Sequence, residues 1–209
     1  MTLAVLGYAA FEFASEVSGH AALKPAAPPP AARASQAAAT ATATLPTPTA
    51  AATTVTPVPP RPRLIVPVSA VAFGPDGTAD GDNPQNAGRV LTDPADGWVT
   101  QWYATANFGA LKQGTGLLLD MGHTVTIATV RLTLGSYPGT NLELRLGTSP
   151  VFGALPVVAS ANNAGTVLSL SLKAPVRARY VLLWFTKLPP NGAGTYQEFV
   201  HGVTVQGRR

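Results

Sequence analysis

The sequence predicts an all-β domain, an antiparallel β-sandwich of the jelly-roll type, that follows a disordered segment. Three observations predict this fold class. Short segments of alternating or β-branched apolar residues recur through residues 64–209. Turn residues separate these segments about every 8–12 positions, and no segment has a helical apolar period. The same region contains 18 of the 20 glycines and all but three of the aromatic residues, so we expect it to form a single folded domain.

The residues before this domain have a different character. Residues 21–63 contain no glycine, and 33 of these 43 residues are Ala, Pro or Thr. Such a composition buries too little apolar surface to order the chain, so we predict a disordered Ala/Pro/Thr-rich linker. Residues 1–20 begin with an apolar stretch that ends before Glu12, shorter than the roughly 20 residues of a membrane span. We interpret it as the stub of a transmembrane helix; a weak signal-like anchor and a short amphipathic helix are the alternatives.

Within the domain, the expected strands differ in how their apolar residues are arranged. Residues 142–146 place Leu at every second position, the pattern of a half-buried strand. Residues 124–134 are rich in β-branched residues, and their apolar phase changes between Ile127 and Val130, which predicts a β-bulge. Residues 176–185 become continuously apolar, as in a central strand covered on both faces. Further strands are expected at residues 64–73, 98–103, 116–120, 156–159, 168–172 and 199–205.

Composition excludes several classes of function. The chain has no cysteine, which excludes disulfides, Cys-ligated zinc and thiol catalysis. The formal net charge is only +4, and the basic residues do not alternate with aromatic ones, so nucleic-acid binding is not expected. The sequence has no phosphate-binding loop, no Rossmann glycine pattern, no HExxH helix and no GxSxG elbow. We therefore predict that the domain is not an enzyme and has no catalytic residues.

One acidic segment suggests a cation. Half of the ten acidic residues lie within residues 76–96, a stretch rich in Gly, Pro and Asn. Calcium prefers carboxylate and carbonyl oxygens on a tightly turning backbone. A structural Ca²⁺ bound by Asp80, Asp82 and Asp93 is one interpretation, although the spacing does not match an EF-hand. The other interpretation is a long surface connection in which the Asp side chains form Asx-turns.

Aromatic residues beside predicted turns form the second candidate site. Sugar rings stack their apolar faces on exposed aromatic side chains, and Asn or Asp groups in loops can bond their hydroxyls. Trp98 and Trp184 are instead expected in the core, where large aromatic residues of a sandwich usually lie. The predicted ligand-binding residues are Trp102, Tyr103, Tyr137, Asn191 and Tyr196.

Four stretches also resemble a known domain family. They are residues 83–98, which end in DPADGW, FGALKQGTGLLLDMG (residues 108–122), RYVLLWFTKLPP (residues 179–190) and QEFVHGVTV (residues 197–205). On these stretches the domain resembles the discoidin-like (F5/8 type C, galactose-binding-like) domain of actinobacterial membrane proteins. It is most similar to the extracytoplasmic domains of MviN-type lipid II flippase homologues and of membrane serine/threonine kinases. Where that family has Asp-Gly-Asp, this chain has Leu91-Thr92-Asp93, which removes one carboxylate from any cation site carried over.

The resemblance implies ligand binding through loops at one end of a jelly roll. Together with the predicted stub and linker, it implies a cell-membrane protein whose β-domain lies in the envelope, outside the cytoplasm. We predict non-catalytic recognition of a cell-wall glycan or peptidoglycan precursor. The alternative is a protein-interaction or scaffold domain of a flippase or kinase, with an envelope protein as its partner. Glycan hydrolysis, which needs two carboxylates across a cleft, is the least favoured interpretation.

Overall fold

The computed structural model describes residues 61–209. The predicted stub over residues 1–20 lies outside the described residues, as does all of the predicted linker except its last three positions. Among the described helices, none combines the length and the apolar character that crossing a membrane requires.

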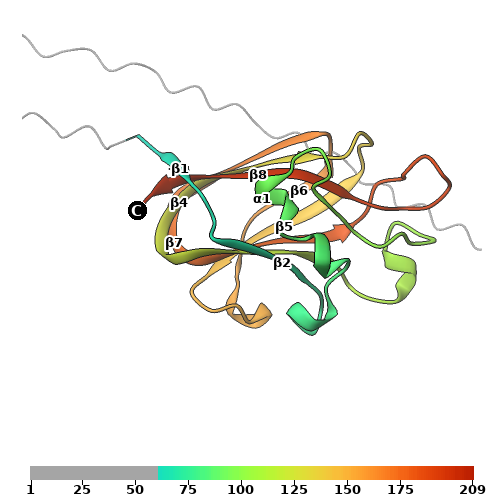
Figure 1. Cartoon of the computed structure of the whole chain (residues 1–209), viewed down its shortest axis with the longest axis horizontal. Helices are drawn as coiled ribbons and strands as arrows, with labels where there is room; N and C mark the ends of the chain where they lie inside the picture. Colours follow the sequence, from blue (N-terminus) through green and yellow to red (C-terminus); the bar gives the residue numbers. More distant parts are fainter. Residues whose placement is uncertain (1–60) are drawn as a thin grey trace, which may run out of the picture. The chain divides into compact units, whose positions relative to one another are not determined.

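Eight strands account for most of the described chain, and its helical segments are single short turns (Figure 1). The strands are β1 (Arg63–Ile65), β2 (Ser69–Phe73), β3 (Trp98–Val99), β4 (Thr115–Leu134), β5 (Thr140–Gly147), β6 (Val157–Ala164), β7 (Val167–Lys187) and β8 (Phe199–Arg208). The helical turns are η1 (Thr78–Asp80), η2 (Pro84–Asn86), α1 (Arg89–Thr92), η3 (Phe108–Ala110) and η4 (Phe152–Ala154). This confirms the predicted all-β class.

Two long strands build both layers of the sandwich. β4 and β7 pair antiparallel along their whole length, with a register shift between Asp120 and Val125 where the pair bends. The first half of β4 pairs with β2, and its second half pairs with β8. β5 and β6 extend the sheet beyond β7, and β1 extends it beyond β8. Every pairing is antiparallel, so the predicted sandwich is confirmed.

The structure corrects the bounds of five expected strands. Residues 116–120 and 124–134 belong to the one strand β4, and residues 168–172 and 176–185 to the one strand β7. Expected strand 64–73 is instead two strands, because β1 pairs with β8 whereas β2 pairs with β4. The predicted bulge is confirmed by a register shift between Ile127 and Thr129.

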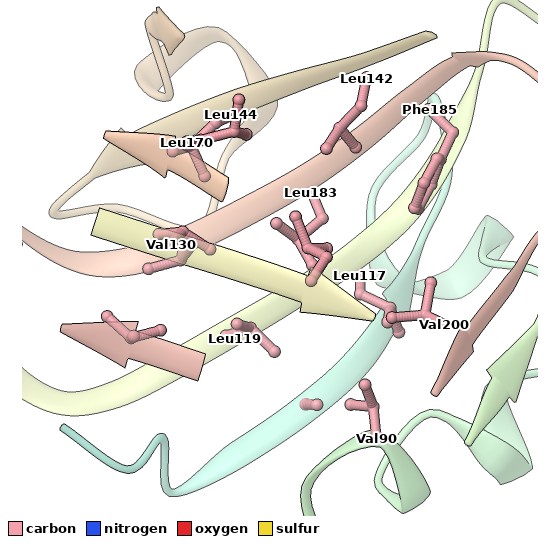
Figure 2. Close-up of a cluster of buried hydrophobic side chains, with 14 of the residues drawn as sticks. Val90, Leu117, Leu119, Val130, Leu142, Leu144, Leu170, Leu183, Phe185 and Val200 are labelled. Atoms are coloured by element: carbon pink, nitrogen blue, oxygen red, sulfur yellow. The ribbon is translucent and has the colours of Figure 1, made fainter. Parts of the chain in front are cut away.

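The main core lies between the two layers. In β5, Leu142, Leu144 and Leu146 are buried at every second position, as the alternation predicted. Figure 2 shows Leu142 and Leu144 in the same cluster as Leu183 and Phe185 of β7. Burying each such side chain stabilises the fold by about 1.5–3 kcal/mol.

The continuously apolar end of β7 is explained by a second cluster. Leu183 and Phe185 face the main core, whereas their neighbours Leu182 and Trp184 belong to a separate buried cluster. The ring of Phe152, in the turn η4, lies 4.8 Å from that of Trp184 and covers this outer face. β7 is therefore covered on both faces, as predicted, and both Trp98 and Trp184 are buried.

Candidate functional site

Backbone hydrogen bonds hold the connections together at one end of the sandwich. Tyr103 and Tyr196 exchange two N–H to C=O bonds of 2.9 Å each, and Leu188 N–H donates to Ala106 C=O at 2.9 Å. These bonds join the connection after β3 to the connection between β7 and β8. In Figure 1 both connections lie at the end away from β1 and from the bends of β4 and β7. We call this the loop end, and the opposite one the bend end.

A groove of about 1180 Å³ opens at the loop end. Two of its lining side chains are apolar and largely in solvent: Trp102 is 64% exposed and Leu111 is 82% exposed. Eight other lining residues have polar or charged side chains. They are Asp76, Asp80, Asp82, Asn83, Gln85, Gln101, Lys112 and Gln113. Exposed apolar groups beside convergent polar groups are typical of ligand sites. We call this hollow the Trp102 groove.

The buried carboxylate of Asp82 organises the Trp102 groove. Lys112 Nζ lies 2.5 Å from its Oδ1, while the Tyr103 hydroxyl and the Gln101 N–H each donate to its Oδ2 at 3.0 Å. The indole N–H of Trp98 donates to the Asp82 carbonyl at 2.8 Å. Burial, with the nearby Asp82 charge, raises the pKa of Tyr103 above its ordinary value, so its hydroxyl remains a donor. One residue thus connects the core tryptophan with three groove residues.

Two amides that line the Trp102 groove are fixed by hydrogen bonds. Asn83 has a left-handed backbone (φ 45°), which Asn tolerates better than most residues, and its Nδ2 donates to Val99 C=O at 2.9 Å. Gln101 Nε2 in turn donates to Asn83 Oδ1 at 3.0 Å. Of the two adjacent aromatic residues, Tyr103 is buried and Trp102 is turned to solvent.

A second, smaller cleft of about 260 Å³ also lies at the loop end. Its exposed aromatic residues are Tyr137 (49%) and Phe199 (39%), and the Phe199 ring stacks on that of His201 with centroids 6.0 Å apart. Asn191 lines it too, but the Asn191 side chain bonds within its own loop, to Thr195 Oγ1 at 2.6 Å. We call this hollow the Tyr137 cleft.

Glu198 contributes a buried carboxyl group to the Tyr137 cleft. Its Oε1 accepts hydrogen bonds from the backbone N–H of Phe199 (3.0 Å) and of Gly135 (3.3 Å), and the Thr140 hydroxyl bonds to its Oε2. Burial raises the pKa of Glu198 to about 7, although these hydrogen bonds act in the opposite direction. The Glu198 backbone is fixed by Thr100, whose N–H donates to the Glu198 carbonyl at 3.0 Å.

The predicted ligand-binding residues divide between the two hollows. Trp102 and Tyr103 line the Trp102 groove, and Tyr137 and Asn191 line the Tyr137 cleft. Tyr196 is partly buried against the core and lines neither hollow. Tyr103 is only 7% exposed, because its hydroxyl is bonded to Asp82, so its ring does not offer the stacking surface expected from the sequence.

Sequence reasoning missed three residues of the Trp102 groove: Asn83, Gln101 and Lys112. Lys112 and its partner Asp82 are 30 positions apart, and no local pattern connects them. The role of Glu198 was also missed. The sequence holds one weak sign of this role: Glu198 is a charged residue directly before an apolar strand.

The three aspartates proposed for calcium do not come together as a site. Asp93 Oδ1 accepts two backbone N–H groups of its own loop, at 3.2 and 3.4 Å, which is the Asx-turn of the alternative interpretation. Asp80 is exposed, and Lys112 lies against the carboxylate of Asp82 where a cation would bind. Within residues 61–209, no three His, Cys, Asp or Glu side chains lie close enough together to bind a metal ion. This donor set does not fit a calcium ion.

Comparison with known proteins found no family model that matches the chain. Similar solved structures include the family 32 carbohydrate-binding module of NanJ from Clostridium perfringens in complex with galactose (14% identity, 69% of this chain and 98% of that one, TM-score 0.48). Another is chitosan-binding module 1 of a chitosanase/glucanase from Paenibacillus sp. IK-5 (13% identity, 68% of this chain and 97% of that one, TM-score 0.49). A third is the CBM32 of AlyQ in complex with 4,5-unsaturated mannuronic acid (17% identity, 68% of this chain and 97% of that one, TM-score 0.47). At these identities and TM-scores, neither a family nor a ligand follows for this chain.

Proposed function

We propose that the domain binds a carbohydrate chain at the Trp102 groove and catalyses no reaction on it. The observation that carries the proposal is the exposed indole of Trp102, which lines one groove together with the fixed amides of Asn83 and Gln101. An aromatic face in water gains about 25 cal/mol for each Å² of apolar surface that a ligand covers. A sugar ring covers such a face and leaves its hydroxyl groups at the rim, where amides can bond them.

The polar groups of the groove match the chemistry of sugar hydroxyls. A hydroxyl both donates and accepts, and so does a side-chain amide, which Asn83, Gln85, Gln101 and Gln113 provide. The groove volume of about 1180 Å³ exceeds the roughly 300–1,000 Å³ of a typical small-molecule pocket. This size supports an oligosaccharide segment over a single sugar.

Binding without hydrolysis is supported by the state of the buried carboxylate. Glycoside hydrolysis uses one carboxyl group as an acid and a second as a base or nucleophile. In the groove, the Asp82 carboxylate is paired with Lys112 and bonded by Tyr103, so it is neither free to accept a proton nor free to attack a ring. The remaining groove carboxylates, Asp76 and Asp80, are exposed on its wall.

We further propose that the carbohydrate is a cell-wall glycan or peptidoglycan precursor. This part rests on the family resemblance and on the predicted membrane stub and linker, which would place the domain at the cell envelope. An envelope protein is the second candidate partner. It is favoured by Leu111, whose 82% exposure offers an apolar contact that a sugar does not need.

The proposal is tested by retention of the full chain on purified peptidoglycan and on a glycan array. Trp102→Ala is expected to weaken binding about 10- to 100-fold, because a central aromatic contact often carries this much of the binding free energy. Trp102→Phe keeps an aromatic face and is expected to retain most of the affinity. Tyr137→Ala, at the other hollow, is the matched control and should leave binding unchanged.

Two results would contradict this assignment. Equal binding by Trp102→Ala and the unmodified chain, with loss in Tyr137→Ala, would move the site to the Tyr137 cleft. Retention on no glycan and no wall fraction would favour a protein partner. Because Trp102 is largely in solvent, the melting temperature of Trp102→Ala is expected to stay within about 2 °C, which separates lost binding from lost folding.

A further inference from the structure

Four arginines come together at the bend end of the sandwich. β1 pairs with β8, with Arg63 opposite Gly207, and this brings the start and the end of the described chain side by side. Figure 1 shows β1 and the chain end together, beside the bends of β4 and β7. A hollow of about 370 Å³ there is lined by Arg61, Arg63, Arg208 and Arg209. An adjoining hollow of about 250 Å³ is lined by two of the same arginines, Arg61 and Arg208.

The charge of this cluster is not balanced within the described chain. No acidic side chain lines either hollow, and none of the four arginines forms a salt bridge to any described residue. Arg177 adds to the charge, because it and Arg208 both pair with Thr126 from opposite sides. Gathered guanidinium groups repel each other, so a bound anion would stabilise this arrangement.

Three arginines outside the cluster form salt bridges. Arg89 pairs with Asp96, Arg145 with Glu143, and Arg179 with Asp120, at 2.8–3.0 Å. Arg131 and Arg177 of the described chain, like the four cluster arginines, form no salt bridge to any described residue. What distinguishes the cluster is that four arginines line one hollow with no acidic side chain.

Exposed apolar side chains lie next to the arginine cluster. Leu64 is 62% exposed, Val66 59% and Val68 68%, whereas the alternate residues Ile65 and Pro67 are buried. Leu64 lies in β1, and Val66 and Val68 lie in the crossing from β1 to β2. Three apolar side chains on one side of an extended segment, open to water, indicate a surface that meets another apolar medium.

We propose that the bend end docks on an anionic phospholipid surface. Each guanidinium group of the cluster would donate two N–H bonds to two oxygens of one headgroup phosphate; these are the groups of Arg61, Arg63, Arg208 and Arg209. The three apolar side chains would enter the boundary between headgroups and acyl chains. Free phosphate or an acidic polymer would use the arginines but not Leu64, Val66 and Val68. The combination of charge with apolar side chains therefore favours a lipid surface.

This orientation has a consequence for the Trp102 groove. The segments that line the groove, within residues 75–85 and 101–113, lie away from β1 and the chain end, which carry the arginine cluster. Figure 1 shows the course of these segments. A domain that sits on lipid through its bend end keeps the groove open on the side away from the membrane.

The test is sedimentation of the full chain with two kinds of vesicle, neutral phosphatidylcholine alone and phosphatidylcholine with about 30% phosphatidylglycerol. The apolar stretch within residues 1–20 would bind both kinds of vesicle. The quantity to compare is therefore the difference in affinity between anionic and neutral vesicles. Arg61→Gln/Arg63→Gln/Arg208→Gln is expected to lose about 100-fold in affinity for the anionic vesicles, or about fivefold for each arginine. Leu64→Ser/Val66→Ser/Val68→Ser should weaken binding at both low and high salt.

The matched control, Arg89→Gln/Arg131→Gln/Lys187→Gln, removes the same charge from elsewhere on the domain. If the control and the cluster variant lost equal affinity for the anionic vesicles, the loss would depend only on net charge, and the proposal would be overturned. Equal binding of the unmodified chain to the two kinds of vesicle would overturn it as well. So would binding to dextran sulfate but not to anionic vesicles, since the surface would then recognise an acidic polymer.

Discussion

Replacing Lys112 by Met is expected to lower the free energy of unfolding by about 3–5 kcal/mol. The side chain of Asp82 is only 3% exposed, and Lys112, at 2.5 Å, is the one residue within 61–209 that forms a salt bridge to it. Without that partner the carboxylate is left buried with only the hydrogen bonds of Tyr103 and Gln101. Urea unfolding at pH 7, followed by tryptophan fluorescence, measures the change.

The variant Lys112→Met/Asp82→Asn is expected to recover most of that loss. The Asn side chain has no charge to balance, and its carbonyl oxygen can still accept from Tyr103 and Gln101. Lys173→Met, at an exposed position of β7 with no salt bridge to any described residue, is the matched control and should change stability by less than about 0.5 kcal/mol. A loss below about 1 kcal/mol in Lys112→Met would show that Asp82 does not depend on this ion pair.

Lys112→Met also connects stability with the proposed function. Gln101 N–H and the Tyr103 hydroxyl bond to the same carboxylate, and Trp102 lies between these two residues in the sequence. Rearrangement of an unpaired Asp82 would therefore displace the exposed indole. We expect glycan binding to fall in the single variant and to return in the double one.

The sequence was sufficient for the fold because strands have a local signature. Leucines at every second position predicted β5, and the change of apolar phase predicted the bulge in β4. The bends were missed because period-2 alternation is the same on either side of them. Residues 121–124 can equally be a turn between two strands or a bend within one, and only the pairing of both halves of β4 with β7 decides between them.

The candidate site was harder to predict because its residues are selected by distant partners. Trp102 and Tyr103 are adjacent aromatic residues, and one of the two must face inward in an extended segment. The residue that faces inward is Tyr103, because its hydroxyl donates a hydrogen bond to Asp82, about twenty positions earlier in the sequence. No local pattern shows which of the two rings is buried. Both rings were therefore predicted from the sequence to be stacking surfaces.

Lowering the pH from about 8 to about 5 is expected to stabilise the domain by about 3 kcal/mol through Glu198. Burial raises the pKa of Glu198 to about 7, whereas an exposed Glu has 4.5. Between these two values the folded state holds a proton that the unfolded state has released. The contribution is therefore complete below about pH 4.5 and is lost as the pH rises through about 7. Thermal melting at intervals of one pH unit measures this dependence.

Other groups change stability elsewhere on the pH scale. The hydrogen bond from Arg179 lowers the pKa of Asp120, so Asp120 stays ionised over this range and its contribution is lost only at lower pH. His201 lines the same cleft as Glu198 and is a second ionisable group there. A variant at Glu198 is therefore needed to isolate the carboxyl group.

Glu198→Gln provides that test because Gln is close in shape to a protonated Glu. Its Oε1 can accept from the backbone of Gly135 and Phe199, and its amide can donate to the Thr140 hydroxyl, which is able to accept. We expect Glu198→Gln to equal the unmodified chain near pH 5 and to exceed it by about 3 kcal/mol near pH 8. That difference corresponds to roughly 6–12 °C in melting temperature for a domain of this size. Curves that stay parallel across this range would show that the Glu198 carboxyl group is already ionised, without cost, in the folded protein.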